Sequence, residues 1–160
     1  YKGEELTAKG KKVIVIGGGD TGSDCIGTSI RHGAASVTNF EIMPMGTMER
    51  PEGQPWPFWP MRLRTSSSHK EGADRVFSIS TKRFNTDDKG NLTSLVTVEV
   101  EWVKQPGQRP ILKEVEGTEK EWDCDLVLLA LGFTGSETSA CRGKDSSGSR
   151  TPAMSMTTDV

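Results

Sequence analysis

The chain has 160 residues, of which 33% are hydrophobic, and 20 Lys and Arg face 22 Asp and Glu, which gives a formal net charge of −2. This length suits one ordinary domain, and the balanced charge argues against nucleic acid or an anionic membrane as a partner. No apolar run is long enough to form a membrane helix, and the N-terminus lacks a signal-peptide pattern, so we expect a cytoplasmic protein.

The first predicted elements are a strand and a helix joined by glycines. Residues 1–11 are polar and are interpreted as an incoming connection. Residues 13–16 (VIVI) are apolar throughout, which is typical of a central parallel strand covered by helices on both faces. They lead directly into G-x-G-x-x-G and a predicted helix, the order that binds the pyrophosphate of a dinucleotide.

Each glycine of this motif has its own expected role. Gly17 allows the tight turn, Gly19 lets the backbone approach the pyrophosphate, and Gly22 lets the helix pack closely on the strand. The helix N-terminus then offers free N–H groups and a partial positive charge to the phosphates. The residues expected to line the pyrophosphate are Gly17, Gly18, Gly19, Asp20, Thr21 and Gly22, with the Asp20 carboxylate turned away to a backbone N–H.

The ends of this helix also carry signals. Thr21 and Asp24 have the spacing of a capping box, and Gly33 is placed to end the helix in the left-handed conformation. A second strand is predicted at 37–40, which completes a βαβ start.

The residue after the second strand bears on the choice of cofactor. Glu41 lies about twenty residues beyond the glycine motif, where a carboxylate accepts hydrogen bonds from ribose hydroxyls and repels a 2′-phosphate. Arg50, Arg62 or Arg64 in the following loop would instead attract that phosphate. The choice between NADH and NADPH therefore stays open.

The next segment is too rich in proline for a helix or a central strand, because Pro55 to Pro60 reads PWPFWP. We expect an irregular loop at 46–60. It is either a packed surface loop whose tryptophans fill a gap or an aromatic contact for a partner domain or the cofactor. A short helix with an N-cap serine is predicted at 66–71.

Strand signals dominate the second half of the chain. Residues 76–84 and 95–103 alternate on either side of a turn at 87–91, and a third short strand at 111–115 follows a turn at 106–107. Residues 125–132 return to a buried, central-strand pattern. Residues 136–160 are rich in serine and threonine and are interpreted as a disordered tail or as sequence that does not belong to the domain.

The cysteines suggest no special chemistry. Cys25, Cys124 and Cys141 are widely spaced and have no histidines nearby, so we expect neither a disulfide nor a zinc or other metal site. Cys25 and Cys124 are expected to be buried thiols.

Four stretches together resemble the small (beta) subunit of glutamate synthase, a two-dinucleotide-fold flavoprotein. They are VIVIGGGDTGSDC (13–25), VTNFEIMP (37–44), PWPFWPMRLRT (55–65) and DLVLLALGFTG (125–135). The tryptophan and proline block is more specific than the glycine motif. The fold this implies is α/β: a Rossmann-like parallel sheet with an antiparallel β-meander insertion, of the FAD/NAD(P)-binding type, over residues 12–135.

The resemblance also implies a role in electron supply. NAD(P)H would bind this domain and pass hydride to the FAD domain of its own parent chain. Iron–sulfur clusters would carry electrons on to the large (alpha) subunit, which makes glutamate from glutamine and 2-oxoglutarate. FAD and the clusters belong to the parent protein, because this chain lacks both halves of the flavin domain and the cysteine-rich region.

For the residues of this chain, the resemblance implies that Ala130, Leu131 and Gly132 face the nicotinamide. Hydride moves directly from nicotinamide to flavin, so no catalytic residue is expected here, and the chain alone should bind the cofactor without turnover. Two alternatives remain: the same domain in a pyrimidine- or ferredoxin-type flavoprotein reductase, or a non-catalytic nucleotide-binding or assembly module.

Overall fold

The computed structural model describes residues 6–60, 62–105, 107 and 109–132, and the backbone of two short strands at 135–137 and 153–155. The chain divides into two units, the first ending at Ala130 and the second beginning at Leu131.

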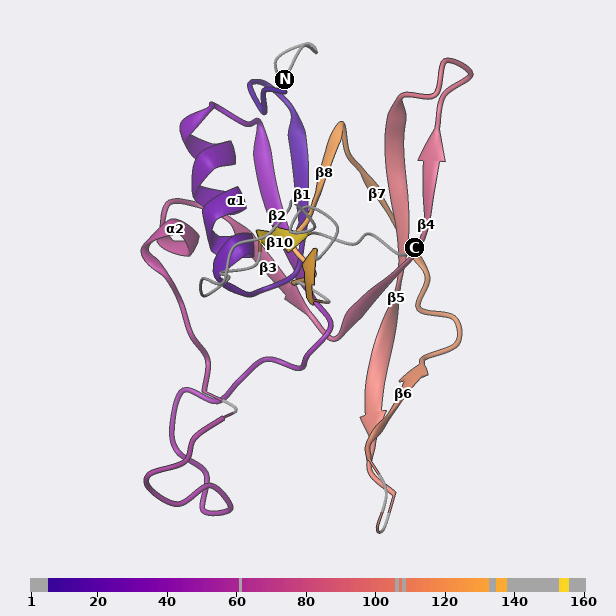
Figure 1. Ribbon diagram of the computed structural model, residues 1–160. Helices are drawn as coiled ribbons and strands as arrows, with labels where there is room; N and C mark the ends of the chain where they lie inside the picture. The colour runs from indigo at the N-terminus through magenta and orange to yellow at the C-terminus, as the bar shows by residue number, and fades with distance from the viewer. Residues whose placement is uncertain are drawn as a thin grey trace, which may run out of the picture. The chain divides into compact units, whose positions relative to one another are not determined.

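The first unit is built on a parallel sheet with the strand order β3-β2-β1-β8. Its strands are β1 (Lys12–Ile16), β2 (Ser36–Glu41), β3 (Asp74–Phe77) and β8 (Leu126–Leu129), and every pairing between them is parallel. The helix α1 (Asp20–Arg31) connects β1 to β2 and lies against one face of the sheet (Figure 1). The predicted βαβ start is confirmed.

An antiparallel sheet follows, made of β4 (Ile79–Thr86), β5 (Leu92–Val103), β6 (Ile111–Glu114) and β7 (Lys120–Asp123). The long β5 pairs with β4 along one edge, and with β7 and then β6 along the other. The meander and the turn at 87–91 are confirmed, whereas β7 was not predicted. Residue 106 of the second predicted turn lies outside the described residues.

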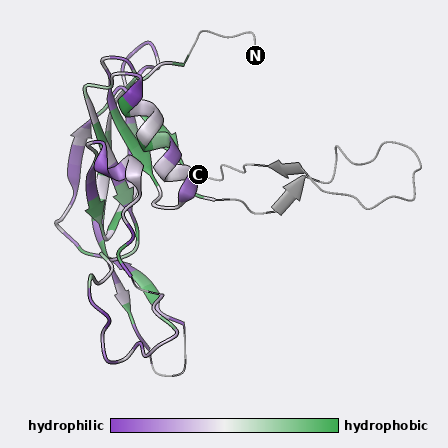
Figure 2. Ribbon diagram, turned by 90° about the vertical axis from the view of Figure 1, so that its left-hand side faces the viewer, coloured by the Kyte–Doolittle hydropathy of each residue, from purple (hydrophilic) through white to green (hydrophobic). Residues whose placement is uncertain are grey.

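The parallel sheet has an apolar core on each face, as the alternation along β1 requires. Val13 and Val15 pack with Ile26 of α1, whereas Ile14 packs with Ile79 and Leu95 of the antiparallel sheet. In Figure 2 the hydrophobic colouring is strong on the strands that form these layers. The expectation of helices on both faces is therefore wrong, because strands supply the apolar surface on the second face.

Two strand predictions are also corrected. The predicted strand at 76–84 is broken at Ser78, whose φ of +54° takes the chain out of β3 and into the antiparallel sheet as β4. The predicted central strand at 125–132 is β8, an edge strand of four residues that are all half-buried. A short apolar run has the same appearance at the edge of a sheet as at its centre.

The ends of α1 are partly as expected. The helix begins at Asp20 with Gly19 as N-cap and has no side-chain cap, so the predicted capping box of Thr21 and Asp24 is wrong. Thr21 already lies inside the helix and does not have the extended conformation of an N-cap. At the other end, Gly33 has φ of +80°, which confirms the left-handed stop.

The connection between β2 and β3 contains the predicted loop and short helix. In the described residues from 42 to 66, regular structure is limited to an isolated bridge between Thr47 and Arg62. The helix α2 (Ser67–Lys70) follows with Ser66 as N-cap, and a capping box joins Ser66 to His69. Both predictions are confirmed.

The second unit contains an antiparallel pair of strands, β9 (Gly135–Glu137) and β10 (Ala153–Ser155). The rest of the predicted tail and Cys141 lie outside the described residues, and the disorder of 136–160 stays a prediction. None of the described helices has the length and apolar character needed to cross a membrane.

Candidate dinucleotide-binding site

The turn after β1 can be made only by glycine at position 17. Gly17 has φ of +115°, and an added Cβ would overlap the carbonyl oxygen of Ala130 and lie 2.8 Å from its carbonyl carbon. The buried side chain of Asn39 stabilises this turn, since its Nδ2 donates to the carbonyls of Val15 (3.1 Å) and Gly17 (2.9 Å). Sequence reasoning missed Asn39, because an asparagine in a strand gives no pattern of its own.

The other two glycines of the motif differ from each other. A Cβ at Gly22 would overlap the carbonyl oxygen of Gly17 and lie 3.1 Å from its carbonyl carbon, so Gly22 allows the helix to pack on the turn, as predicted. A Cβ at Gly19 would have no atom within 4 Å. Gly19 therefore borders open space, and packing within the protein does not require a glycine at this position.

The N-terminus of α1 leaves its first amides unpaired. The first helical bond runs from the Ser23 N–H to the Gly19 carbonyl (3.0 Å). In the described part of the chain, nothing accepts from the N–H groups of Asp20, Thr21 and Gly22, and Gly19 has no side chain to do so. A helix N-terminus with free amides beside open space fits the pyrophosphate of a dinucleotide.

Asp20 departs from its expected conformation. Its side chain is exposed, and its carboxylate accepts no hydrogen bond from the described residues. The expected turn of this carboxylate toward a backbone N–H is therefore not seen.

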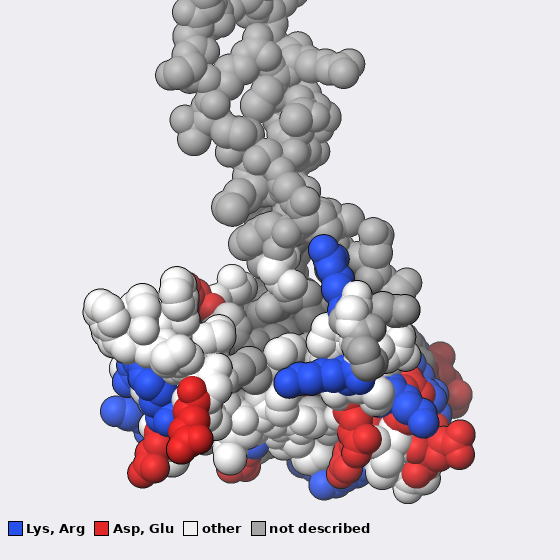
Figure 3. Space-filling view, turned by 90° about the horizontal axis from the view of Figure 1, so that it is seen from below, with Lys and Arg blue, Asp and Glu red and all other residues white. Residues whose placement is uncertain are grey.

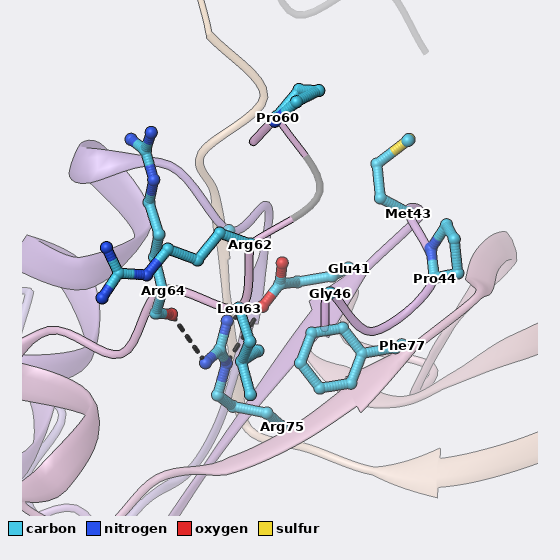
Figure 4. Close-up of a pocket in the computed structure, with 11 residues that line it drawn as sticks. Glu41, Met43, Pro44, Gly46, Pro60, Arg62, Leu63, Arg64, Arg75 and Phe77 are labelled. Carbon is cyan, nitrogen blue, oxygen red and sulfur yellow. Dashed lines mark hydrogen bonds and ion pairs between the residues drawn. The ribbon is translucent and has the colours of Figure 1, made fainter. Parts of the chain in front are cut away.

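A cavity of about 240 Å³ lies at the end of β2 (Figure 4). We call it the Glu41 cavity. Its lining residues are Gly18, Glu41, Met43, Pro44, Gly46, Pro60, Arg62, Leu63, Arg64, Arg75 and Phe77. Gly18 is the contact with the glycine motif, because a Cβ there would meet the Glu41 carboxylate. The cavity thus begins where the pyrophosphate site ends, as the adenosine half of a dinucleotide requires.

Glu41 is not a free carboxylate. Its Oε1 accepts from Nε (3.0 Å) and Nη2 (2.5 Å) of Arg75, and both side chains are largely buried. Sequence reasoning missed Arg75, because the strand predicted directly after it, at 76–84, was assigned to the antiparallel meander. As part of β3, the parallel neighbour of β2, it comes to the same edge of the sheet as Glu41.

The arginines proposed for a 2′-phosphate separate into two groups. Arg62 and Arg64 are exposed and line the Glu41 cavity, with their guanidinium groups directed away from Glu41 (Figure 4). Arg50 does not line it, because its Nη1 donates to the carbonyls of Gln54 (3.2 Å) and Phe58 (2.9 Å).

The tryptophan and proline loop has one packed and two exposed aromatic side chains, and the contact with a partner domain or the cofactor stays a prediction. Trp59 is half-buried, donates to Thr47 Oγ1 (3.0 Å), and has the guanidinium carbons of Arg50 and Arg62 at 5.1 and 5.2 Å from its ring. Trp56 and Phe58 are instead 83% and 74% exposed. Figure 3, seen from the end where this loop lies, shows an uncharged surface at the left with acidic and basic side chains next to it.

The residues expected at the nicotinamide lie at the division between the units. Ala130 is buried and belongs to the first unit, where its N–H donates to the Ile16 carbonyl (2.8 Å). Leu131 and Gly132 begin the second unit, with Leu131 exposed and Gly132 at φ of +91°. Their role toward nicotinamide stays a prediction.

The remaining titratable groups do not form a centre of their own. Burial raises the pKa of the Cys124 thiol to about 11, while Cys25 is half-buried rather than buried as expected. Burial also lowers the pKa of His69, whose Nε2 has no partner in the described residues. Within that part of the chain, no three His, Cys, Asp or Glu residues are grouped as a metal site would need.

The parallel sheet, the antiparallel sheet and the glycine loop together define an α/β fold of the FAD/NAD(P)-binding type. The structure is similar to that of Mycobacterium tuberculosis FprA in complex with NADPH, with a TM-score of 0.56 at 14% sequence identity. The similarity covers 82% of this chain and 41% of that one. The predicted fold class is confirmed.

Sequence similarity identifies the nearer relatives. The chain is 48% identical over 147 residues to glutamate synthase [NADH] of Schizosaccharomyces pombe and 48% identical over 132 residues to the glutamate synthase [NADPH] small chain of M. tuberculosis. These matches cover 88% and 82% of this chain, but only 7% and 26% of the two relatives. No protein family profile matches the chain. The chain is homologous to one segment of the glutamate synthases, which confirms the resemblance seen in the sequence.

Proposed function

We propose that this chain is the NAD(P)H-binding domain of a glutamate synthase. The observation that carries the proposal is the uncapped N-terminus of α1, which follows the glycine loop and lies next to the Glu41 cavity. The amides of Asp20, Thr21 and Gly22 would bind the pyrophosphate, and Glu41 would accept a hydrogen bond from the adenosine ribose.

In this proposal the nicotinamide supplies a hydride to FAD, which is held by another part of the parent protein. The residues of this chain bind and orient the cofactor, and none of them needs to move a proton. Gly17 and Gly22 keep the loop and helix in place, and the open side of Gly19 leaves room for the phosphates. The chain alone would then bind the cofactor without turnover, and the electrons would end on the imine of 2-oxoglutarate that forms in the large subunit.

The test has two stages. Calorimetric titration of the 160-residue chain with NADPH and with NADH should show binding of at least one of them. Mixing that cofactor with the parent protein should bleach the flavin, and adding the large subunit with glutamine and 2-oxoglutarate should restore its colour. The absence of heat with both cofactors would overturn cofactor binding. Bleaching that only a different acceptor reverses would favour a pyrimidine- or ferredoxin-type reductase instead.

A second role, in assembly, is favoured by the exposed aromatic side chains of the loop. Trp56 and Phe58 make little contact with their own unit, and an exposed aromatic pair on a loop is typical of a docking contact. We propose the FAD domain of the parent chain as the partner. Alanine at both positions should leave cofactor binding by the 160-residue chain unchanged and slow flavin reduction in the parent protein, and an unchanged rate would exclude this role.

A further inference from the structure

We propose that Arg75 determines how well the Glu41 cavity accepts a phosphate at the 2′ position of the adenosine ribose. It does so by balancing the negative charge of Glu41 and by binding one of its two carboxylate oxygens. This inference rests on the proposed function, because it places the adenosine half of the cofactor in that cavity.

The Glu41–Arg75 pair differs from the other ion pairs of the molecule. Its side chains are 14% and 16% exposed, whereas every other ion pair in the described part of the chain has both side chains at least 32% exposed. Water screens an exposed pair, while a largely buried pair keeps most of its interaction. Arg75 is therefore placed to change the charge that a ligand in the cavity meets.

The hydrogen bonds divide the two oxygens of Glu41 between different tasks. Both bonds from Arg75 go to Oε1. Oε2 accepts none from the described residues, and it is the atom nearest to the position of a Cβ on Gly18. Arg75 thus turns the carboxylate so that one oxygen remains available on the side of the glycine loop, where a ribose hydroxyl can donate to it.

Four of the five N–H groups of Arg75 already have partners within the protein. Its Nε and Nη2 donate to Glu41, and its Nη1 donates to the Arg64 carbonyl (3.0 Å) and to Thr65 Oγ1 (3.5 Å). Arg62 and Arg64 line the same cavity, are exposed, and form no ion pair with the other described residues. We therefore assign Arg75 as a positioning residue that acts through Glu41, and Arg62 and Arg64 as the groups that meet a 2′-phosphate.

Without Arg75, the Glu41 carboxylate would face a 2′-phosphate as an unpaired negative charge. Repulsion between like charges at a binding site should weaken binding at least about tenfold. A ribose that carries only hydroxyls meets no such repulsion. Loss of Arg75 should therefore change the ratio of the two affinities, which a general loss of structure would not do.

The experiment compares adenosine 2′,5′-bisphosphate with ADP as calorimetric probes of the 160-residue chain. In Arg75→Met, binding of the 2′,5′-bisphosphate should weaken at least about tenfold more than binding of ADP. In the double variant Glu41→Gln with Arg75→Met, the ratio should return to within about threefold of the original, because neither charge remains. The double variant also protects the test against misfolding, since it leaves no unpaired buried charge.

The control is Arg83→Met, which removes an exposed arginine that pairs with Glu119 (3.7 Å) outside the cavity. It should leave both affinities unchanged. If Arg75→Met leaves the ratio of the two affinities unchanged, including by weakening both probes equally, the inference is overturned. Failure of the double variant to recover would show that Arg75 binds the phosphate itself and would also overturn it. Failure of the unsubstituted chain to bind either probe would instead refute the proposed function.

Discussion

Replacing two glycines of the same motif by alanine should affect two different properties: stability at Gly22 and cofactor affinity at Gly19. At Gly22 the added Cβ would overlap the backbone carbonyl oxygen of Gly17, and no side-chain rotation relieves an overlap with backbone. Helix α1 would have to move away from the turn, at a cost of about 1–3 kcal/mol for an overpacked, closely fitted contact. For a domain of this size, that lowers the melting temperature by roughly 10 °C.

Gly19→Ala should leave the fold nearly unchanged. Its φ of −79° is one that alanine adopts, and no atom lies within 4 Å of the new Cβ. Alanine is a poorer N-cap than glycine, but it also restricts the unfolded chain, and these two effects of about 1 kcal/mol oppose each other. The Cβ would instead occupy the space assigned to the pyrophosphate, so the affinity for the cofactor should fall at least about tenfold.

Urea unfolding followed by tryptophan fluorescence gives the stability of each variant, and calorimetric titration with NADPH or NADH gives its affinity. Gly22→Ala should lower the free energy of unfolding, while Gly19→Ala should lower the affinity alone. Equal destabilisation by the two substitutions would refute the packing argument. Normal cofactor binding by Gly19→Ala would refute the assignment of the open side to the ligand.

Three further predictions concern buried polar groups. Asn39→Ala should lower the free energy of unfolding by about 1–3 kcal/mol, because the carbonyl of Gly17 loses its buried donor, and unchanged urea unfolding would contradict this. Iodoacetamide at pH 8 should label Cys25 of the folded protein well before Cys124, whose pKa is raised to about 11 by burial. Equal labelling of the two thiols in the folded protein, measured by peptide mass spectrometry, would contradict this. Unfolded protein should react at both sites. Stability should fall as the pH drops below 6.5, because burial and the nearby Arg75 lower the pKa of His69. Below that pH the unfolded chain takes up a proton that the folded chain does not. His69→Gln should reduce this pH dependence in melting curves at pH 8 and pH 5.5.

The sequence allowed the local parts of this site to be predicted, but not the parts made by distant pairing. The turn at Gly17, the packing of Gly22 and the stop at Gly33 follow from short-range patterns, and the structure shows each of them. Arg75 lies far from Glu41 in sequence, and it meets Glu41 only because β3 pairs with β2 in parallel. No periodicity within residues 75–84 separates a parallel strand from the hairpin that follows it.

The covering of the second face was unpredictable for a related reason. Ile79 and Leu95 show the alternation of half-buried strands, which identifies them as facing a core but not which core. The uncapped start of α1 was missed because Thr21 and Asp24 imitate a capping box by spacing alone. For the second face the missing information was the position of a partner that is remote along the chain, whereas the start of α1 was misread from a local pattern.

The pairing of β1 with β8 has a consequence for how the protein is made. Val13 pairs with Leu126, and the Lys12 N–H donates to a side-chain oxygen of Asp125, 113 positions further along. During synthesis, the apolar strand β1 therefore keeps one edge unpaired until nearly the whole first unit has left the ribosome. An unpaired apolar edge readily pairs with a second copy, so aggregation of nascent chains or of truncated products that end before residue 126 is the principal hazard of this topology.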